Sequence, residues 1–461
     1  MMPEERYKKL KEYLSAENPV LLDVIDKYKA LDKLGHKVGL IEQSETYTSN
    51  ISWWPMISVL GTFSAGKSSF INQYIGEDIQ QSGNHAVDDK FTVICYGNND
   101  EAITLPGLAL DADPRFPFYN ISEEINHVDT GEGNRVNLYL QLKTLKSPQI
   151  KGKILIDSPG FDADSQRDGI LRITNHIVEM SDLVLIFFDA RHPEPGAMRD
   201  TLEHLVSTTI EHKDANKVLY ILNQIDTTAK EDNLEDVIAS WQRALSKEGL
   251  ISGNFYSIYN ENASNTIEDT AMEERLKNKK DIDLARIIDR MDKVSIERAY
   301  RIIKALEDFA KEIKEEKIPL VQALLKQWGS KVLWADLVVV ILLITIVGVL
   351  QLQLNLLTTA LSQMIAGGAF VVALMFAHFK ARSFFANSIA KKWEEKDVAI
   401  AKAVLHNTKW WRTIFGFGRN WHQGTKNKLD TLMTQGREAI QKLNDQFVAA
   451  SASSENVENK K

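Results

Sequence analysis

The feature that most constrains the fold is a glycine-rich octet that directly follows a short apolar run. Met56–Leu60 has the length and composition of a buried strand, and G-T-F-S-A-G-K-S at 61–68 fits the pattern G-x-x-x-x-G-K-[ST]. In this pattern the glycines let backbone N–H groups turn onto phosphates, the lysine reaches the β- and γ-phosphates, and the last hydroxyl ligates Mg²⁺. A helix that begins at Lys67 adds its positive N-terminal end. The octet therefore predicts a P-loop phosphate site.

Two later segments carry the motifs that accompany such a loop. The apolar run Lys153–Ile156 leads into D-S-P-G at 157–160, a D-x-x-G in which Asp157 would lie near Mg²⁺ and the Gly160 amide near the γ-phosphate. Val218–Leu222 leads into N-Q-I-D at 223–226, and the Asp226 carboxylate suits the N1–H and N2–H donors of guanine. Three motifs in chain order, each after a predicted strand, predict a nucleotide-binding G domain.

The surrounding pattern predicts an α/β fold. From Met56 to about Ile258, apolar runs of four to six residues alternate with helical stretches. The clearest strands are 56–60, 91–96, 153–156, 183–188 and 218–222. Strands that alternate with helices predict a mostly parallel sheet covered by helices on both faces.

The motifs also carry a resemblance to a known family. The string G-T-F-S-A-G-K-S-S and the long spacing from Lys67 to Asp157 resemble the dynamin superfamily. The run from Gly76 to Gly97 is most similar to Eps15-homology-domain ATPases and bacterial dynamin-like proteins. The resemblance covers about residues 50–260 and implies that Ser64 orients the β–γ bridging oxygen and the attacking water. It also implies that the Ala65 carbonyl helps to hold a charge-compensating cation.

The expected site follows from the motifs and the resemblance together. The catalytic candidates are Ser64, Lys67 and Gly160, and the Mg²⁺ candidates are Ser68 and Asp157. The expected nucleotide contacts are Gly61, Thr62, Phe63, Ser64, Ala65, Gly66, Lys67, Ser68, Ser69, Asn223, Gln224 and Asp226. The expected substrate is GTP, with ATP left open, and the expected cofactor is Mg²⁺.

Two positions depart from the family pattern. In the family, a switch threonine that ligates Mg²⁺ and positions the attacking water is expected at position 87 or 88. This chain has Val87 and Asp88 there, so Asp88 or Thr92 would have to replace that threonine. Gln224 stands where the family usually has a lysine that packs along the base. We expect a GTPase, and the alternative is a nucleotide-gated membrane scaffold or sensor that binds GTP or ATP with little hydrolysis.

A second anomaly lies in the C-terminal half. Leu337–Phe379 holds 43 consecutive residues without Asp, Glu, Lys or Arg, in a chain that is 26% charged. As a helix this stretch would be about 65 Å long, roughly twice the ~30 Å hydrocarbon core of a bilayer. We expect a two-span hairpin, and the alternatives are a hairpin buried in a bundle or a paddle inserted part way. Flanking charges such as Lys331 and Lys380 predict that both termini are cytosolic.

Composition bounds the partners. The segment from Lys380 to Lys428 combines basic residues with the aromatic residues Trp410, Trp411, Phe415, Phe417 and Trp421. This combination predicts contact with anionic lipid headgroups or, alternatively, packing of the aromatic side chains on a helical stalk. A net charge of −8 argues against a nucleic-acid partner, and the single cysteine excludes an intrachain disulfide. No secretory signal pattern opens the sequence.

These observations predict a membrane-anchored dynamin-like chain. Its expected order of G domain, helices, membrane element and further helices resembles that of mitofusins. The resemblance implies that G domains of two copies dimerise and that a stalk couples this pairing to membrane remodelling, tethering or fusion. The expected parts are N-terminal stalk helices at 1–50, a G domain at 51–280, a stalk helix at 281–334, a hairpin at 335–379, basic stalk helices at 380–448 and a disordered tail at 449–461.

Overall fold

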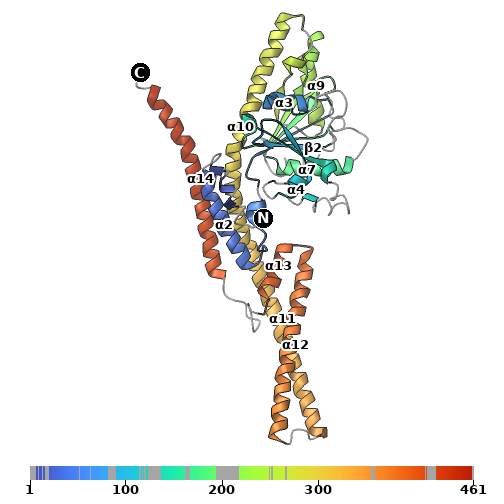
Figure 1. Ribbon diagram of the computed structural model, residues 1–461, viewed down its shortest axis with the longest axis vertical. Helices are drawn as coiled ribbons and strands as arrows, with labels where there is room; N and C mark the ends of the chain where they lie inside the picture. Colours follow the sequence, from blue (N-terminus) through green and yellow to red (C-terminus); the bar gives the residue numbers. More distant parts are fainter. Residues whose placement is uncertain are drawn as a thin grey trace. The chain divides into compact units, whose positions relative to one another are not determined.

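The chain divides into two compact units in the computed structural model (Figure 1). The globular unit comprises Ile51–Tyr300, and the helical unit comprises Met1–Asn50 together with Arg301–Lys461. The structure describes residues 7–8, 10–12, 14–15, 20–50, 52–62, 64–80, 90–113, 116, 118, 121–122, 136–160, 167–193, 217–248, 250, 253–264, 267–354, 359–410, 412 and 422–458.

The globular unit is built on one sheet. Its described strands run in the order β3-β4-β2-β5-β1-β6-β7-β8, with β1 hydrogen-bonded in parallel to β5 on one side and to β6 on the other. The β2–β5 and β3–β4 pairs are antiparallel, and the other described pairs are parallel, so the sheet is mixed but mostly parallel. The bounds are β1 Met56–Gly61, β2 Phe91–Tyr96, β3 Ile103–Pro106, β4 Leu140–Leu145, β5 Ile154–Asp157, β6 Leu183–Asp189, β7 Val218–Asn223 and β8 Asn254–Ser257.

The structure confirms the five predicted strands to within one residue at each end, as β1, β2, β5, β6 and β7. Three further strands escaped prediction. β3 is exposed along its whole length and β8 is mostly half-buried, so neither carries the apolar run that marks a buried strand. β4 has the alternating pattern of a strand covered more fully on one face, which is weaker than a continuous run.

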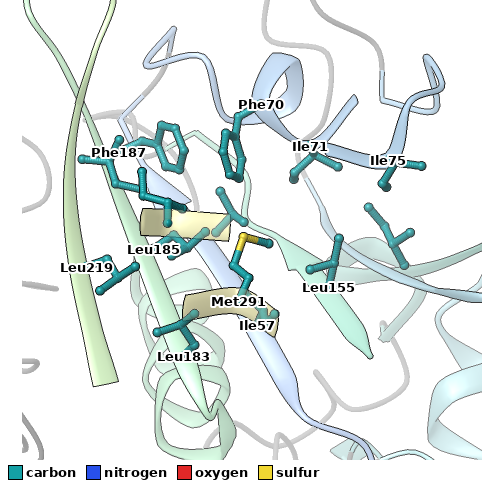
Figure 2. Close-up of a cluster of buried hydrophobic side chains, with 14 of the residues drawn as sticks. Ile57, Phe70, Ile71, Ile75, Leu155, Leu183, Leu185, Phe187, Leu219 and Met291 are labelled. Atoms are coloured by element: carbon teal, nitrogen blue, oxygen red, sulfur yellow. The ribbon is translucent and has the colours of Figure 1, made fainter. Parts of the chain in front are cut away.

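Helices cover both faces of the sheet because its strands are apolar on both sides. Along β6, one set of alternate residues packs on α3 and the middle of α10, and the other set packs on α9 and the start of α10. Figure 2 shows the first of these cores, where the rings of Phe70 on α3 and Phe187 on β6 lie 5.0 Å apart. The helices here are α3 Lys67–Ile75, α4 Leu108–Asp111, α6 Val136–Tyr139, α7 Arg167–Met180, α9 Leu234–Lys247 and α10 Thr270–Glu312, whose last turns belong to the helical unit.

The helical unit packs its N-terminal helix on the helices that follow residue 300. The Tyr28 hydroxyl on α2 donates to the Ile302 carbonyl at 2.8 Å, and the Tyr47 ring lies 5.4 Å from that of Phe309. The segment that follows residue 300 therefore packs against the N-terminal segment. The helices are α2 Val20–Val38, the end of α10, a π-helical turn Ile313–Lys317, α11 Ile318–Leu354, α12 Ala360–Glu394, α13 Val398–Asn407 and α14 His422–Glu458.

Several boundaries differ from the predicted ones. α2 ends at Val38, short of the predicted end of the stalk helices at residue 50, because Gly39 adopts a left-handed φ of +84° and closes the helix with a 2.8 Å bond to the Gly35 carbonyl. α10 runs unbroken across the expected boundary at 280. α14 is helical to Glu458, within the segment expected to be disordered, and the Ala and Glu residues there favour helix.

The uncharged segment forms a helical hairpin from the end of α11 and the start of α12 (Figure 1). Both helices are long and apolar enough to cross a membrane, and hardly any of their apolar surface is covered within the described residues. Thr359 caps α12 through a capping box with Ser362. The exposed apolar side chains include Leu337, Val338, Ile341, Leu342, Ile344, Ile346, Val349 and Leu352 on α11 and Leu361, Met364, Ile365, Val371, Val372, Met375, Phe376 and Phe379 on α12.

One histidine gives the helical unit a pH dependence. His406 on α13 packs so closely against Gly39 that a Cβ added to Gly39 would lie 2.6 Å from the His406 Cβ. Burial, followed by the charges of Arg412, Lys409 and His36, lowers the pKa of His406 from 6.5 to about 4. Between these values the unfolded chain binds a proton that the folded chain does not, so stability falls as the pH is lowered through this window.

We expect the denaturant concentration at the unfolding midpoint of the wild type to decrease as the pH is lowered from 6.5 to 4. The decrease should be smaller in His406→Gln. Chemical denaturation followed by circular dichroism at several pH values measures it. The control is His192→Gln, at an exposed position of the globular unit. An identical pH dependence in the wild type and His406→Gln would contradict the assignment.

Candidate functional site

The glycine-rich loop has the backbone of a phosphate cradle. It leaves the end of β1 at Gly61 and enters α3 at Lys67, with Gly66 at the N-cap. Ser64 and Gly66 have φ angles of 59° and 83°, in the left-handed region that turns successive N–H groups toward one side. A Cβ on Gly66 would lie 2.2 Å from the Asn223 amide nitrogen, so both the backbone and the space require glycine there.

Lys67 is held inside this loop. Its ammonium donates to the carbonyls of Gly61 at 3.0 Å and Thr62 at 3.2 Å, and the side chain is buried. Burial lowers the pKa of Lys67, and the carboxylate of Asp157 opposes that shift. An ammonium fixed under a loop of N–H donors is suited to the phosphates of a nucleotide.

Asp157 and Ser68 bring oxygen donors together beside the loop. Parallel pairing of β1 with β5 places Val59 opposite Asp157, so the end of β5 reaches the loop. The Ser68 hydroxyl donates to Asp157 Oδ2 at 3.3 Å. Mg²⁺ prefers carboxylate and hydroxyl oxygens, so this pair fits the cation that the loop implies.

The N-Q-I-D segment clamps the loop from β7. The Asn223 amide donates to the Ala65 carbonyl at 2.9 Å, and the Gln224 amide donates to the Ser64 carbonyl at 2.6 Å. Gln224 itself has a left-handed φ of 64°. The position that usually carries lysine in the family therefore contributes a hydrogen bond to the loop backbone.

A buried carboxylate ends this segment, and an arginine side chain stands at the end of the neighbouring strand β6. Asp226 is buried in the 3₁₀ turn Ile225–Lys230 that follows β7. Arg191 donates from Nε and Nη2 to both oxygens of Asp189 at the end of β6. That contact, followed by the charge of Asp226, raises the pKa of Arg191.

The structure thus brings residues of all three motifs together at the carboxyl ends of β1, β5 and β7. Ser69 lies in the first turn of α3, and Gly160 is half-buried three residues after Asp157. Thr92 is fully buried in β2 opposite Asp157, and its hydroxyl accepts a 2.7 Å bond from Gln141. Phe63, Val87 and Asp88 lie outside the described residues.

Sequence reasoning missed three polar residues that bear on this site. Gln80 contacts Asp157 directly, Lys143 contacts Gln80, and Arg191 interacts electrostatically with Asp226. Arg191 follows a predicted strand end, a position that could have marked it. Gln80 and Lys143 belong to no local motif.

Comparison with known proteins identifies the G domain. Residues 57–225 match the model of the Dynamin family, and the match contains all three motifs up to Ile225. This segment is a dynamin-family domain. EH domain-containing protein 1 of Homo sapiens is 25% identical over 179 residues, which cover 37% of this chain and 31% of the relative. EH domain-containing protein 2 of Homo sapiens is 25% identical over 179 residues, 37% of this chain and 30% of the relative.

The chain therefore matches less than a third of the length of these relatives. Among solved structures, the chain is similar to a bacterial dynamin of a pair whose structure is reported to provide a mechanism for long-range sensing and tethering of membranes. That match has 14% identity, 95% coverage of this chain, 80% of that chain and a TM-score of 0.36.

We expect Lys67→Ala to weaken binding of a fluorescent GTP analogue by roughly 100-fold or more, because two charge-assisted contacts to phosphates are worth about 1.5–3 kcal/mol each. Equilibrium fluorescence titration measures the affinity. Lys146→Ala, which removes an exposed lysine paired with Asp100, is the matched control and should bind like the wild type. Retained affinity in Lys67→Ala would contradict the assignment of the loop.

Proposed function

We propose that this chain is a membrane-anchored, dynamin-like GTPase that uses Mg²⁺ and couples dimerisation of its G domains to membrane remodelling, tethering or fusion. The observation that carries the proposal is the convergence of Lys67, Asp157 and Asn223 at one edge of the sheet, inside a dynamin-family domain. That edge, outside the carboxyl ends of parallel strands, is where open α/β sheets bind ligands.

Each group has a distinct task in this proposal. Backbone N–H groups between Gly61 and Ser68 and the Lys67 ammonium bind the phosphates. Ser68 and Asp157 hold Mg²⁺, which when bound would neutralise charge that develops on the transferring phosphoryl group. Ser64 orients the attacking water, and Gly160 contacts the γ-phosphate.

The Asp226 carboxylate selects the base. Guanine offers it two donors, and adenine offers no equivalent pair. We expect unlabelled GTP to displace a bound fluorescent nucleotide at lower concentration than ATP, and Asp226→Ala to lose most of that preference. Equal competition by GTP and ATP in the wild type would contradict guanine selection and leave an ATP-binding site.

A second function is favoured by one feature of the sequence. Val87 and Asp88 occupy the positions of the family's switch threonine, which helps to position the attacking water. A chain without that hydroxyl would act as a nucleotide-gated scaffold or sensor. Single-turnover hydrolysis with and without liposomes separates the two: tight binding without membrane-stimulated hydrolysis would favour the scaffold.

The membrane anchor is proposed from the dimensions of the hairpin. The uncharged part of α11, Leu337–Leu354, has 18 residues and a length of about 27 Å. The uncharged part of α12, Ala360–Phe379, has 20 residues and a length of about 30 Å. Each leg therefore matches the ~30 Å hydrocarbon core of a bilayer.

Polar contacts between the two helices mark where the apolar legs begin. His378 Nδ1 and Asp336 Oδ2 lie 2.7 Å apart, and the Trp328 indole donates to the Arg382 carbonyl at 3.1 Å. The Arg382 guanidinium lies 4.9 Å from the centre of the Trp328 ring. We place the headgroup boundary at these contacts, because the apolar side chains beyond them are exposed.

The charges at this boundary support a topology and a partner. Lys326, Lys331, Lys380, Lys391 and Lys392 are exposed on the side away from the hairpin turn. Exposed lysines that flank a span favour the cytosolic side and attract anionic headgroups. Both termini of the hairpin then lie in the cytosol.

We expect the wild type to stay in the pellet when membranes are extracted with alkaline carbonate. A double variant, Ile344→Arg and Val371→Arg, should move substantially into the supernatant, because each arginine near the bilayer centre costs roughly 2.5–3.5 kcal/mol. The control is Ile282→Arg with Ile296→Arg, which adds the same charges at exposed positions of α10. Release of the wild type would contradict a spanning hairpin.

A further inference from the structure

We propose that Gln80 is a positioning residue for the magnesium site, which it serves by holding Asp157 through an amide that Lys143 orients. This inference rests on the proposed function, because it concerns the cation that accompanies the nucleotide. Neither Gln80 nor Lys143 belongs to any of the three motifs.

The contact with Asp157 is short and fully enclosed. Gln80 Nε2 donates to Asp157 Oδ2 at 2.7 Å, and Gln80 is only 2% exposed. The Ser68 hydroxyl donates to the same oxygen at 3.3 Å. One carboxylate oxygen is therefore held between a residue of the glycine-rich loop and a residue outside it.

Lys143 decides which way the amide points. Its ammonium lies 2.6 Å from Gln80 Oε1 and 2.9 Å from the Ile79 carbonyl. An ammonium has only donors, so the carbonyl end of the amide must face Lys143 and the NH₂ end must face Asp157. The β4 lysine thus fixes the donor that the carboxylate receives.

Asn72 fixes the backbone of the same residue. Its amide donates to the Gln80 carbonyl at 2.8 Å, and its carbonyl accepts from the Gln80 N–H at 2.9 Å. Asn72 is buried on α3, one turn beyond Ser68. Gln80 is thereby tied at its backbone to α3 and at its side chain to β4 and β5.

These ties link the three elements that carry or flank the cation site. A carboxylate near a metal binds best when its orientation is fixed by hydrogen bonds from neighbouring groups, and loss of such a partner typically lowers metal affinity by 10- to 100-fold. Removal of the Gln80 amide should therefore lower the affinity for Mg²⁺ more than it lowers the affinity for the nucleotide itself.

The test is a Mg²⁺ titration of the full-length chain bound to a fluorescent GTP analogue. In Gln80→Met, which keeps the side-chain length, we expect the half-saturating Mg²⁺ concentration to rise roughly 10- to 100-fold. The affinity for the analogue in EDTA should stay as in the wild type. Lys143→Met should shift the titration in the same direction by a smaller factor, and it carries the test if circular dichroism shows that Gln80→Met does not fold.

The matched control is Gln149→Met, an exposed glutamine of the 3₁₀ turn Pro148–Ile150 whose side-chain oxygen accepts a hydrogen bond from Ser147. It should titrate like the wild type. An unchanged Mg²⁺ titration in Gln80→Met and Lys143→Met, or an equal shift in Gln149→Met, would overturn this inference alone. A wild type that does not bind the analogue would overturn the proposed function with it.

Discussion

The site depends on the parallel pairing of β1 with strands on both sides. The register that sets Val59 opposite both Asp157 and Leu185 brings the ends of β5 and β6 to the level at which the glycine-rich loop leaves β1. β7 follows in parallel beyond β6, so its end carries Asn223 back to the loop. Because parallel strands end on the same edge, polar groups far apart in sequence meet there, and the apolar cores on both faces hold that edge rigid.

A different physical constraint, the covering of apolar surface, applies to the helical unit. Its inner surfaces are closed by pairs such as Tyr28 with Ile302 and Trp328 with Arg382, as in any helix bundle. Beyond the Asp336–His378 contact, the two helices continue with apolar side chains exposed, Leu352 to 87% and Met364 to 75%. Such a surface is costly in water, and its backbone groups are satisfied within the helices, as a bilayer requires.

Much of the candidate site could be predicted from the sequence, because each motif directly follows a predicted strand. An apolar run that ends in Gly61, Asp157 or Asn223 predicts both a strand and the position of the motif at its end. Gln80 could not be found this way, because its role comes from contacts with residues 63 and 77 positions further along the chain. β3 and β8 were not predicted because they are the outermost strands of the described sheet, where a strand is less buried and needs no continuous apolar run.

The most direct test of the coupling between the G domain and the membrane is GTP turnover per chain in liposomes at increasing protein density. We predict that turnover per chain rises with surface density, because the proposed dimerisation would let G domains of neighbouring copies complete one another's sites. It should also exceed the turnover of dilute protein in detergent. Turnover per chain that does not change with density would contradict a dimerisation-coupled GTPase.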